Sequence, residues 1–158
     1  MFGLLALAAC SPDVHAGDGT ATVGHVVDGD TIDVHIGGRD ERIRLIGIDT
    51  PETKKPDTPV ECFGPEASAF TTAMLPVGTT VRIERDIVGR DDYGRILGYV
   101  FIPGDDTERE VFVNDEIIRQ GFAEPLSIGP NTAYAARFVE SARTAEERDL
   151  GLWGACSQ

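Results

Sequence analysis

The chain has 158 residues and a mass of 17.0 kDa, which is the size of one compact domain. Its 41% hydrophobic residues suffice for one core, and the scattered 18 Gly and 9 Pro exclude a collagen-like repeat and wholesale disorder. The formal net charge of −13 is opposite to the basic footprint of most nucleic-acid-binding proteins, and it favours a self-repelling protein or one whose acids hold a cation.

The N-terminal residues 1–9 are small or apolar and carry no charge. They are too few to span a bilayer, which takes about 20 residues, and they are typical of the apolar region of a secretion signal. The stretch from Leu7 to Cys10 resembles the lipobox of bacterial lipoproteins, which implies lipidation of Cys10. Because no Lys or Arg precedes it, a plain cleaved signal or an apolar tail remains an alternative. Residues 10–20 are expected to form a flexible tether. From the signal-like residues before them we expect an exported protein, either a cell-envelope lipoprotein or a secreted one.

Strands dominate the next part of the chain. Two runs rich in β-branched residues, 21–27 and 31–36, flank the Asp-Gly-Asp at 28–30. Asp-Gly between such runs is a strong hairpin signal. Alternating residues predict a third strand over 42–48, which the following Thr-Pro ends.

The second half mixes strands with helices. Pro65 suits the first helical turn, and Glu66 suits the positive end of the helix dipole. Asn114 is expected to cap a short helix that Gly121 ends. The expected elements are strands over 79–87 and 95–102 joined by a polar turn at 89–94, and helices over 64–75, 114–120 and from Asn131 or Thr132 to about Leu150.

Five strands and three helices predict an α+β fold that is mainly β: a small, closed or partly open barrel with helices packed on it. A five-stranded OB-fold barrel is the best-known solution of this size. We expect this domain to cover residues 21–154 and to be followed by a short tail, 155–158.

The three cysteines are Cys10, Cys62 and Cys156. If Cys10 takes a lipid, an even number remains in an oxidising compartment, where a Cys62–Cys156 disulfide would staple the chain end to the domain. Two free buried thiols are the alternative. The sequence contains no CxxC or HxxxH pattern, which argues against a zinc site.

Four short motifs point to chemistry: Asp-Gly-Asp at 28–30, Arg44, Asp-Thr-Pro-Glu at 49–52, and Asp-Asp-Tyr-Gly-Arg at 91–95. Each alone is an ordinary turn or surface feature. In this order they resemble the thermonuclease (staphylococcal-nuclease-like) family. The resemblance covers residues 21–153, and it includes the first helix of that family at 63–70, Arg-Gln-Gly at 119–121 and Leu-Trp at 152–153.

The resemblance implies the family's OB-fold barrel with three helices and a Ca²⁺-dependent nuclease that leaves 3′-phosphate ends on DNA or RNA. Asp30, Asp49 and the backbone carbonyl of Thr50 are implied as ligands of Ca²⁺, a cation that prefers such hard oxygen donors.

Phosphodiester hydrolysis gathers negative charge on the phosphoryl oxygens, and cations already in place stabilise it. By the same resemblance, Arg44 and Arg95 bind the phosphate, because a guanidinium stays charged and matches its planar edge. Glu52 is implied as the general base or as the residue that orients the attacking water. Tyr93 and Leu97 are implied as substrate-binding residues, with ordinary packing as the alternative. We expect a monomer.

The chain departs from well-known members of that family at two places. Asp92 stands where they carry a Lys, and residues 124–129 have no aromatic side chain where they carry two pocket tyrosines. Because base stacking contributes about 1–3 kcal/mol per base, the nucleotide pocket is expected to be looser. Tyr134 is a candidate for partial compensation.

Two other functions are compatible with parts of the sequence: a non-catalytic OB-fold module that binds nucleic acid, and an acidic envelope lipoprotein. The full set of proposed catalytic residues argues against the first. The acidity lies mostly away from this set, since residues 1–38 hold five acids and no Lys or Arg, and residues 104–124 hold seven acids and two bases. Weak non-specific binding to polyanions and a strong reliance on Ca²⁺ are the expected result.

Overall fold

The computed structural model describes residues 19–53 and 59–156. The predicted signal at 1–9, Cys10 and the tail residues 157 and 158 lie outside the described residues. So does the predicted tether except for its last two residues, Gly19 and Thr20, which instead begin the first strand. Across the described part of the chain, no helix has the length and apolar character needed to cross a membrane.

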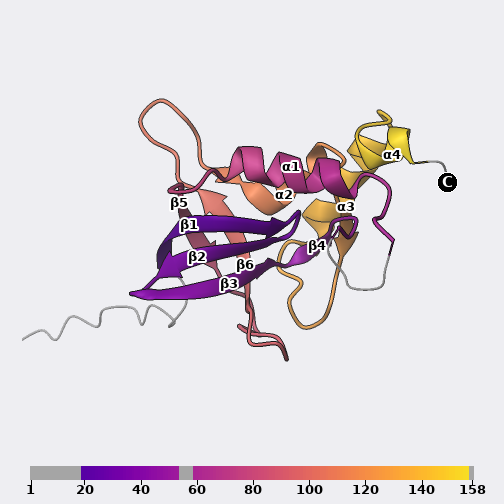
Figure 1. Ribbon diagram of the computed structural model, residues 1–158. Helices are drawn as coiled ribbons and strands as arrows, with labels where there is room; N and C mark the ends of the chain where they lie inside the picture. The colour runs from indigo at the N-terminus through magenta and orange to yellow at the C-terminus, as the bar shows by residue number, and fades with distance from the viewer. Residues whose placement is uncertain (1–18, 54–58, 157–158) are drawn as a thin grey trace, which may run out of the picture.

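Five strands form a closed barrel (Figure 1), as predicted. β1 (Gly19–Asp28), β2 (Thr31–Ile36) and β3 (Arg39–Leu45) make an antiparallel meander. β5 (Thr80–Glu84) pairs with β1 and with β6 (Ile96–Ile102), both antiparallel. A parallel pairing of β3 with β6 closes the ring.

Three shorter strands lie outside the ring. β7 (Val111–Phe112) extends the sheet beyond β6, and β4 (Gly47–Asp49) pairs with β8 (Glu124–Leu126) in a separate two-stranded sheet. Neither β7 nor β8 was predicted, since two or three residues show no periodicity that a sequence pattern can detect.

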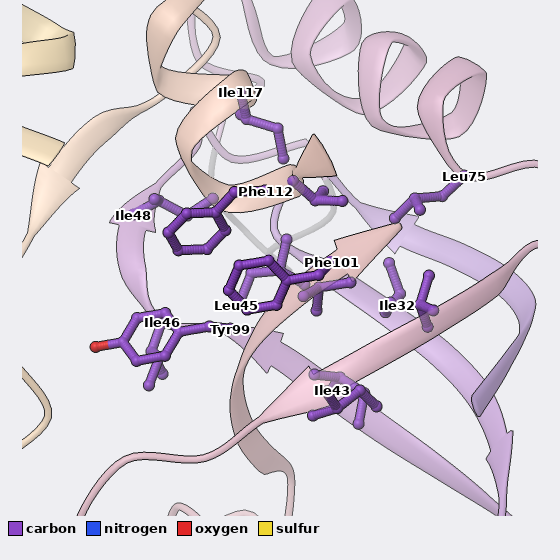
Figure 2. Packing of buried hydrophobic residues seen from close by; sticks show 14 of the residues in the cluster. Ile32, Ile43, Leu45, Ile46, Ile48, Leu75, Tyr99, Phe101, Phe112 and Ile117 are labelled. Atoms are coloured by element: carbon purple, nitrogen blue, oxygen red, sulfur yellow. The ribbon is translucent and has the colours of Figure 1, made fainter. Parts of the chain in front are cut away.

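The described residues form four helices, two of which lie directly against barrel strands. α1 (Gly64–Met74) lies against β1, and α2 (Val113–Arg119) lies against β6 and α3 (Ala135–Glu146). A final turn, α4 (Leu152–Ala155), follows α3 near the C-terminus. The core lies between the barrel and these helices, and Figure 2 shows aliphatic residues of the strands packed with Phe101 and Phe112, whose rings stack at 4.3 Å.

The strand predicted over 42–48 is wrong in one respect, because the chain breaks at Ile46 and leaves two strands, β3 and β4. Gly47 has a φ of 82°, and a Cβ there would lie 2.3 Å from the Phe138 ring. Only glycine fits so close an approach in the left-handed region. The break turns β4 out of the barrel toward β8.

The predicted cap of the middle helix is also wrong. α2 begins at Val113, and Asn114 is fully buried inside it. The Asn114 amide accepts a hydrogen bond from the Val100 backbone N–H at 2.9 Å and donates one to the Ile46 carbonyl at 2.9 Å. This side chain therefore joins β6 to the end of β3, a tertiary role that outweighs capping. Gly121, at a φ of 77°, does end the helix as predicted.

The last helix is shorter than predicted, since α3 begins at Ala135 and ends at Glu146. Asn131 does not start it. Its amide instead accepts a hydrogen bond from the Val88 N–H and donates one to the Val88 carbonyl, each at 2.8 Å. A polar side chain that satisfies a loop backbone in this way favours a non-helical conformation.

A disulfide joins Cys62, just before α1, to Cys156, just after α4. It links segments 94 residues apart, so the C-terminal end of the described chain is tied to the start of the first helix. Free thiols at these two positions, the alternative reading of the sequence, are not what the structure contains.

Candidate active site

The turn between β1 and β2 is packed directly against the loop that follows β4. Asp30 Oδ2 accepts hydrogen bonds from the backbone N–H of Thr50 at 3.2 Å and from its hydroxyl at 3.1 Å. A Cβ on Gly29 would lie 2.7 Å from the Thr50 hydroxyl oxygen, so the turn needs glycine for this close approach. From the other side, the Thr71 hydroxyl of α1 donates to the Gly29 carbonyl at 2.6 Å. The hairpin turn is thus held by two other parts of the fold.

Arg44, near the end of β3, brings two of the predicted metal ligands together. Its Nη2 lies 3.1 Å from Asp30 Oδ2 and 3.0 Å from Asp49 Oδ1. Its Nη1 donates to the backbone carbonyl of Ile48 at 3.0 Å. The Arg44 side chain is only 15% exposed, so these contacts hold the guanidinium in one orientation.

Glu52 lies in the loop after β4, where its position is defined by neighbours on both sides. Its carboxylate Oε1 accepts a hydrogen bond from the Thr53 N–H at 2.9 Å. The Asp28 carboxylate accepts a hydrogen bond from the Thr53 hydroxyl at 2.8 Å, and the Glu52 and Asp28 carboxyl groups are also in hydrogen-bond contact. On the far side, Glu61 Oε2 accepts the backbone N–H of Glu52 at 2.9 Å.

Arg95 is not joined to the Arg44 network. Its Nε donates to Asp91 Oδ2 at 2.7 Å, and its guanidinium lies 5.5 Å from the centre of the Tyr93 ring. Tyr93 itself is 86% exposed. Arg95 therefore stands beside the turn between β5 and β6, oriented by a carboxylate four residues before it.

One open groove, of about 1340 Å³, connects these groups. Arg44 and Arg95 both line it, as do Glu52 and Tyr93. Asp30, Asp49 and Thr50, the predicted metal ligands, line it too. The structure thus brings every predicted catalytic and metal-binding residue to one groove, although Arg95 reaches it from a separate element.

A second cavity, of about 520 Å³, adjoins the groove and shares Arg44, Arg95 and Tyr93 with it. Leu97, a predicted substrate-binding residue, lines this cavity. Much of the apolar wall comes from the break between β3 and β4, from β4, β6 and β8, and from the segment after β8: Ile46, Ile48, Leu97, Leu126 and Ile128.

Tyr134 does not compensate for the missing pocket tyrosines. Its ring packs edge-on against Tyr99 at 4.6 Å, and its hydroxyl donates to Glu84 Oε1 at 2.8 Å. It belongs to the aromatic core rather than to the second cavity. Asp92, where well-known relatives carry a Lys, does line that cavity, so its wall is both aliphatic and acidic at this corner.

Two acids of the groove, Asp49 and Asp28, have raised pKa values. Desolvation raises the pKa of Asp49, and nearby Asp30, Glu61 and Glu124 add to the rise, while Arg44 opposes it. Desolvation is also the main cause that raises the pKa of Asp28. Burial, more than the charge of neighbouring acids, therefore disfavours the ionised form of these two carboxyl groups.

The donor set fits a hard divalent cation. Asp30 and Asp49 are held close enough to share one guanidinium nitrogen, and carboxylate and carbonyl oxygens are the ligands that Ca²⁺ prefers. Within residues 19–53 and 59–156, no group of three or more His, Cys, Asp or Glu side chains is arranged to hold a metal ion. With so few protein ligands, a bound Ca²⁺ would keep water and room for a phosphate.

Two contributors escaped the sequence analysis. Glu61 holds the backbone of Glu52, and its only sequence signal was its place beside Cys62. Asp91 orients Arg95, and its i, i+4 spacing to that arginine was a detectable signal of an ion pair.

The chain is similar in sequence to known nucleases. The family model described as "Staphylococcal nuclease homologue" matches residues 42–155. The thermonuclease of Staphylococcus intermedius is 42% identical over 131 residues, which cover 83% of this chain and 74% of that protein. The thermonuclease of Staphylococcus hyicus is 38% identical over 139 residues, covering 88% and 78%. The SPbeta prophage-derived endonuclease YokF of Bacillus subtilis (strain 168) is 34% identical over 134 residues, covering 84% of this chain and 43% of that protein.

Proposed function

The chain belongs to the staphylococcal nuclease family, and from this premise we propose that it is a Ca²⁺-dependent nuclease that hydrolyses DNA and RNA to products with 3′-phosphate ends. The printed names of its relatives, thermonuclease and endonuclease, support a nuclease. The observation that carries the proposal is the Arg44 guanidinium bonded to Asp30 and Asp49 in a groove that Glu52 and Arg95 also line.

Asp30, Asp49 and the Thr50 carbonyl are the residues that would hold Ca²⁺. When bound there, the ion would supply positive charge to the phosphoryl oxygens as negative charge develops on them. Thr50 donates both its backbone N–H and its hydroxyl to Asp30, which holds that carboxylate in place at the groove.

Arg44 and Arg95 bind the scissile phosphate. Arg44 is already oriented by two backbone carbonyls and two carboxylates, so little entropy is lost when it engages a phosphate oxygen. Arg95, oriented by Asp91, lines the same groove from the turn between β5 and β6. Two guanidinium groups stay charged throughout and match the charge that grows in the transition state.

Glu52 takes the proton of the attacking water. As the water oxygen forms its bond to phosphorus, the bond from phosphorus to the 5′ oxygen breaks, and that oxygen takes a proton from solvent water and leaves as the 5′-hydroxyl. A carboxylate acts as a base in this way only if it is positioned within reach of the water. The hydrogen bond from the Thr53 N–H, which holds one Glu52 carboxylate oxygen, and the place of Glu52 in the groove support this role.

The test is an assay on single- and double-stranded DNA and on RNA, with Ca²⁺ or with EGTA. We expect EGTA to abolish cleavage and Glu52→Ala to lower kcat by about 10²–10⁴-fold, the usual contribution of a general base. Glu66→Ala, which removes an exposed acid from the first turn of α1, is the matched control and should cleave normally. Full activity in EGTA or in Glu52→Ala would refute the mechanism.

The same experiment separates the two alternatives. A non-catalytic OB-fold module would bind single-stranded DNA without cleaving it, and an acidic envelope lipoprotein would bind neither nucleic acid nor Ca²⁺. Cleavage that depends on both Ca²⁺ and Glu52 would exclude both.

We also propose that the protein works outside the cytoplasm, either anchored by a lipid on Cys10 or secreted. The Cys62–Cys156 disulfide supports this placement, because disulfides persist mainly in oxidising compartments. Metabolic labelling with a palmitate analogue tests the anchor: label should enter the wild-type protein and be lost in Cys10→Ala.

A further inference from the structure

Glu61 makes two hydrogen bonds to the backbone of Glu52. The Glu61 side chain accepts the Glu52 N–H at 2.9 Å, and the Glu61 N–H donates to the Glu52 carbonyl at 3.0 Å. One residue therefore satisfies both backbone groups of the proposed general base. Two bonds in opposite directions fix the position and the orientation of this backbone, and with them the point from which the Glu52 side chain extends.

Glu61 is itself anchored on its C-terminal side. The next residue, Cys62, forms the disulfide to Cys156, and Phe63 stacks on Phe122 with ring centres 5.2 Å apart. Cys156 directly follows α4, whose first residue, Leu152, donates its N–H to the Gly121 carbonyl at 2.8 Å. The segment that carries Glu61 is thus fastened to α4 and to the end of α2.

The loop around Glu52 is also pressed against the start of α1. A Cβ on Gly64 would lie 3.1 Å from the Glu52 carbonyl oxygen and 3.2 Å from that of Pro51. On the opposite side, Asp28 and Asp30 bond to Thr53 and to Thr50. The loop is therefore held between the hairpin turn and the segment that begins at Glu61.

We propose that Glu61 is a positioning residue for Glu52, and that the Cys62–Cys156 disulfide keeps Glu61 in place. This inference rests on the proposed nuclease function of the groove. Glu61 acts through its hydrogen bond to the Glu52 backbone, so that without it the Glu52 carboxylate shifts relative to Arg44. Displacements of about 1 Å at a reacting group can cost about 10²-fold in rate, so a partly released loop is expected to cost about tenfold.

The test compares Glu61→Ala, Glu61→Gln and the control Glu66→Ala, all with the disulfide intact. We expect Glu61→Ala to lower kcat about tenfold with KM changed less than twofold, since the substrate-binding arginines are untouched. Glu61→Gln should restore most of kcat, because the carboxamide oxygen still accepts the Glu52 N–H. Equal losses in both variants would overturn the proposal, since they would assign the effect to the charge of Glu61.

Amide hydrogen exchange supplies a readout that does not depend on activity. We expect the Glu52 amide to exchange at least tenfold faster in Glu61→Ala than in the wild type, with thermal unfolding nearly unchanged. An unaltered Glu52 amide in that variant would overturn the proposal. If the wild type itself shows no cleavage, the proposed function fails, and the exchange rates still decide whether Glu61 holds this backbone.

The disulfide is tested by the double variant Cys62→Ser/Cys156→Ser. Its kcat should fall in the same direction as in Glu61→Ala, and adding Glu61→Ala to it should cost less than in the wild type, because coupled groups are not additive. Cys62 is exposed, so mild reduction of the wild-type protein gives an independent arm with the same expected result. Full additivity of the two losses would remove the disulfide from the proposal.

Discussion

Asp30 and Thr50 lie 20 residues apart in the chain, yet Thr50 donates both its backbone N–H and its hydroxyl to the same Asp30 oxygen. Both residues are buried, at 8% exposed each. Two donors from one residue hold this buried carboxylate oxygen in a fixed position. The pair therefore fixes the position of one proposed Ca²⁺ ligand at the groove.

Thr50→Val tests that dependence. The change keeps the side-chain volume close to that of Thr and removes the hydroxyl, so the buried Asp30 carboxylate loses one donor. We expect the free energy of unfolding to fall by about 1–3 kcal/mol, as for other buried groups left short of a partner. Urea titration measures it. Thr50→Ser, which keeps the hydroxyl, is the control, and a Thr50→Val protein as stable as Thr50→Ser would contradict this account.

Ca²⁺ is expected to stabilise the folded chain. A ligand present at 100 times its dissociation constant adds about 2.7 kcal/mol when it binds only the folded state. Thermal unfolding should therefore shift upward as Ca²⁺ is added to the wild-type protein, and further with a nucleoside bisphosphate.

Asp49→Asn is the matched variant for this titration. Asp49 is mostly exposed, and desolvation and neighbouring acids raise the pKa of its carboxyl, so the substitution removes a ligand without opening the core. We expect the variant to fold and to lose most of the Ca²⁺-dependent shift. A shift as large as in the wild type would exclude Asp49 as a ligand.

The aliphatic second cavity predicts a gain-of-function variant. Ile128 is 67% exposed at the cavity wall, where no aromatic residue is present in the segment 124–129. Ile128→Tyr would offer a surface for base stacking, which contributes about 1–3 kcal/mol per base. We expect KM for single-stranded DNA to fall about fivefold or more with kcat little changed. Val77→Tyr, at an exposed site outside the groove and the second cavity, should leave KM unchanged.

One surface ion pair predicts a pH-dependent contribution to stability. Arg42 donates to both Asp33 oxygens, at 2.7 and 3.0 Å, and this hydrogen bonding lowers the pKa of Asp33. A lowered pKa means that the pair stabilises the fold above the unfolded-state pKa and that this contribution is lost as pH falls through the folded-state pKa.

Because both side chains are partly exposed, we expect Asp33→Asn to cost at most about 1 kcal/mol at pH 7. Urea unfolding of the wild type and the variant at several pH values checks this: the difference should shrink from pH 6 toward pH 3. A difference that stays constant over this range would show that the ionised pair does not stabilise the fold.

Much of the barrel could be predicted from the sequence, because alternation and turn residues report local structure directly. The first hairpin and the strand before Ile102 are found where the pattern placed them. The errors are of a different kind. Gly47, at the break after β3, leaves room for the Phe138 ring, and the buried Asn114 side chain hydrogen-bonds to the backbone of Val100 and Ile46. Both depend on residues distant in sequence, which periodicity cannot report.

The site shows the same division. Asp30, Asp49 and Arg44 could be grouped from ordered motifs, and the structure places both carboxylates within hydrogen-bond distance of the Arg44 guanidinium. The residue that positions Glu52 could not be predicted. Glu61 accepts the Glu52 backbone N–H through a side-chain contact across nine residues, and no composition or spacing marks that contact.

The parallel pairing that closes the barrel has a consequence for how this protein gains its activity. Its register sets Ile43 opposite Ile96, Arg44 opposite Leu97 and Leu45 opposite Gly98. Arg44 thus lies where β3, the last strand of the meander, pairs with β6, a strand some fifty residues later in the sequence. A chain in which the meander and the β5–β6 pair have formed, but β3 is not yet paired with β6, would contain every proposed catalytic side chain. These side chains would not yet be arranged around one groove. Recovery of cleavage during refolding should therefore follow closure of the ring rather than the appearance of secondary structure.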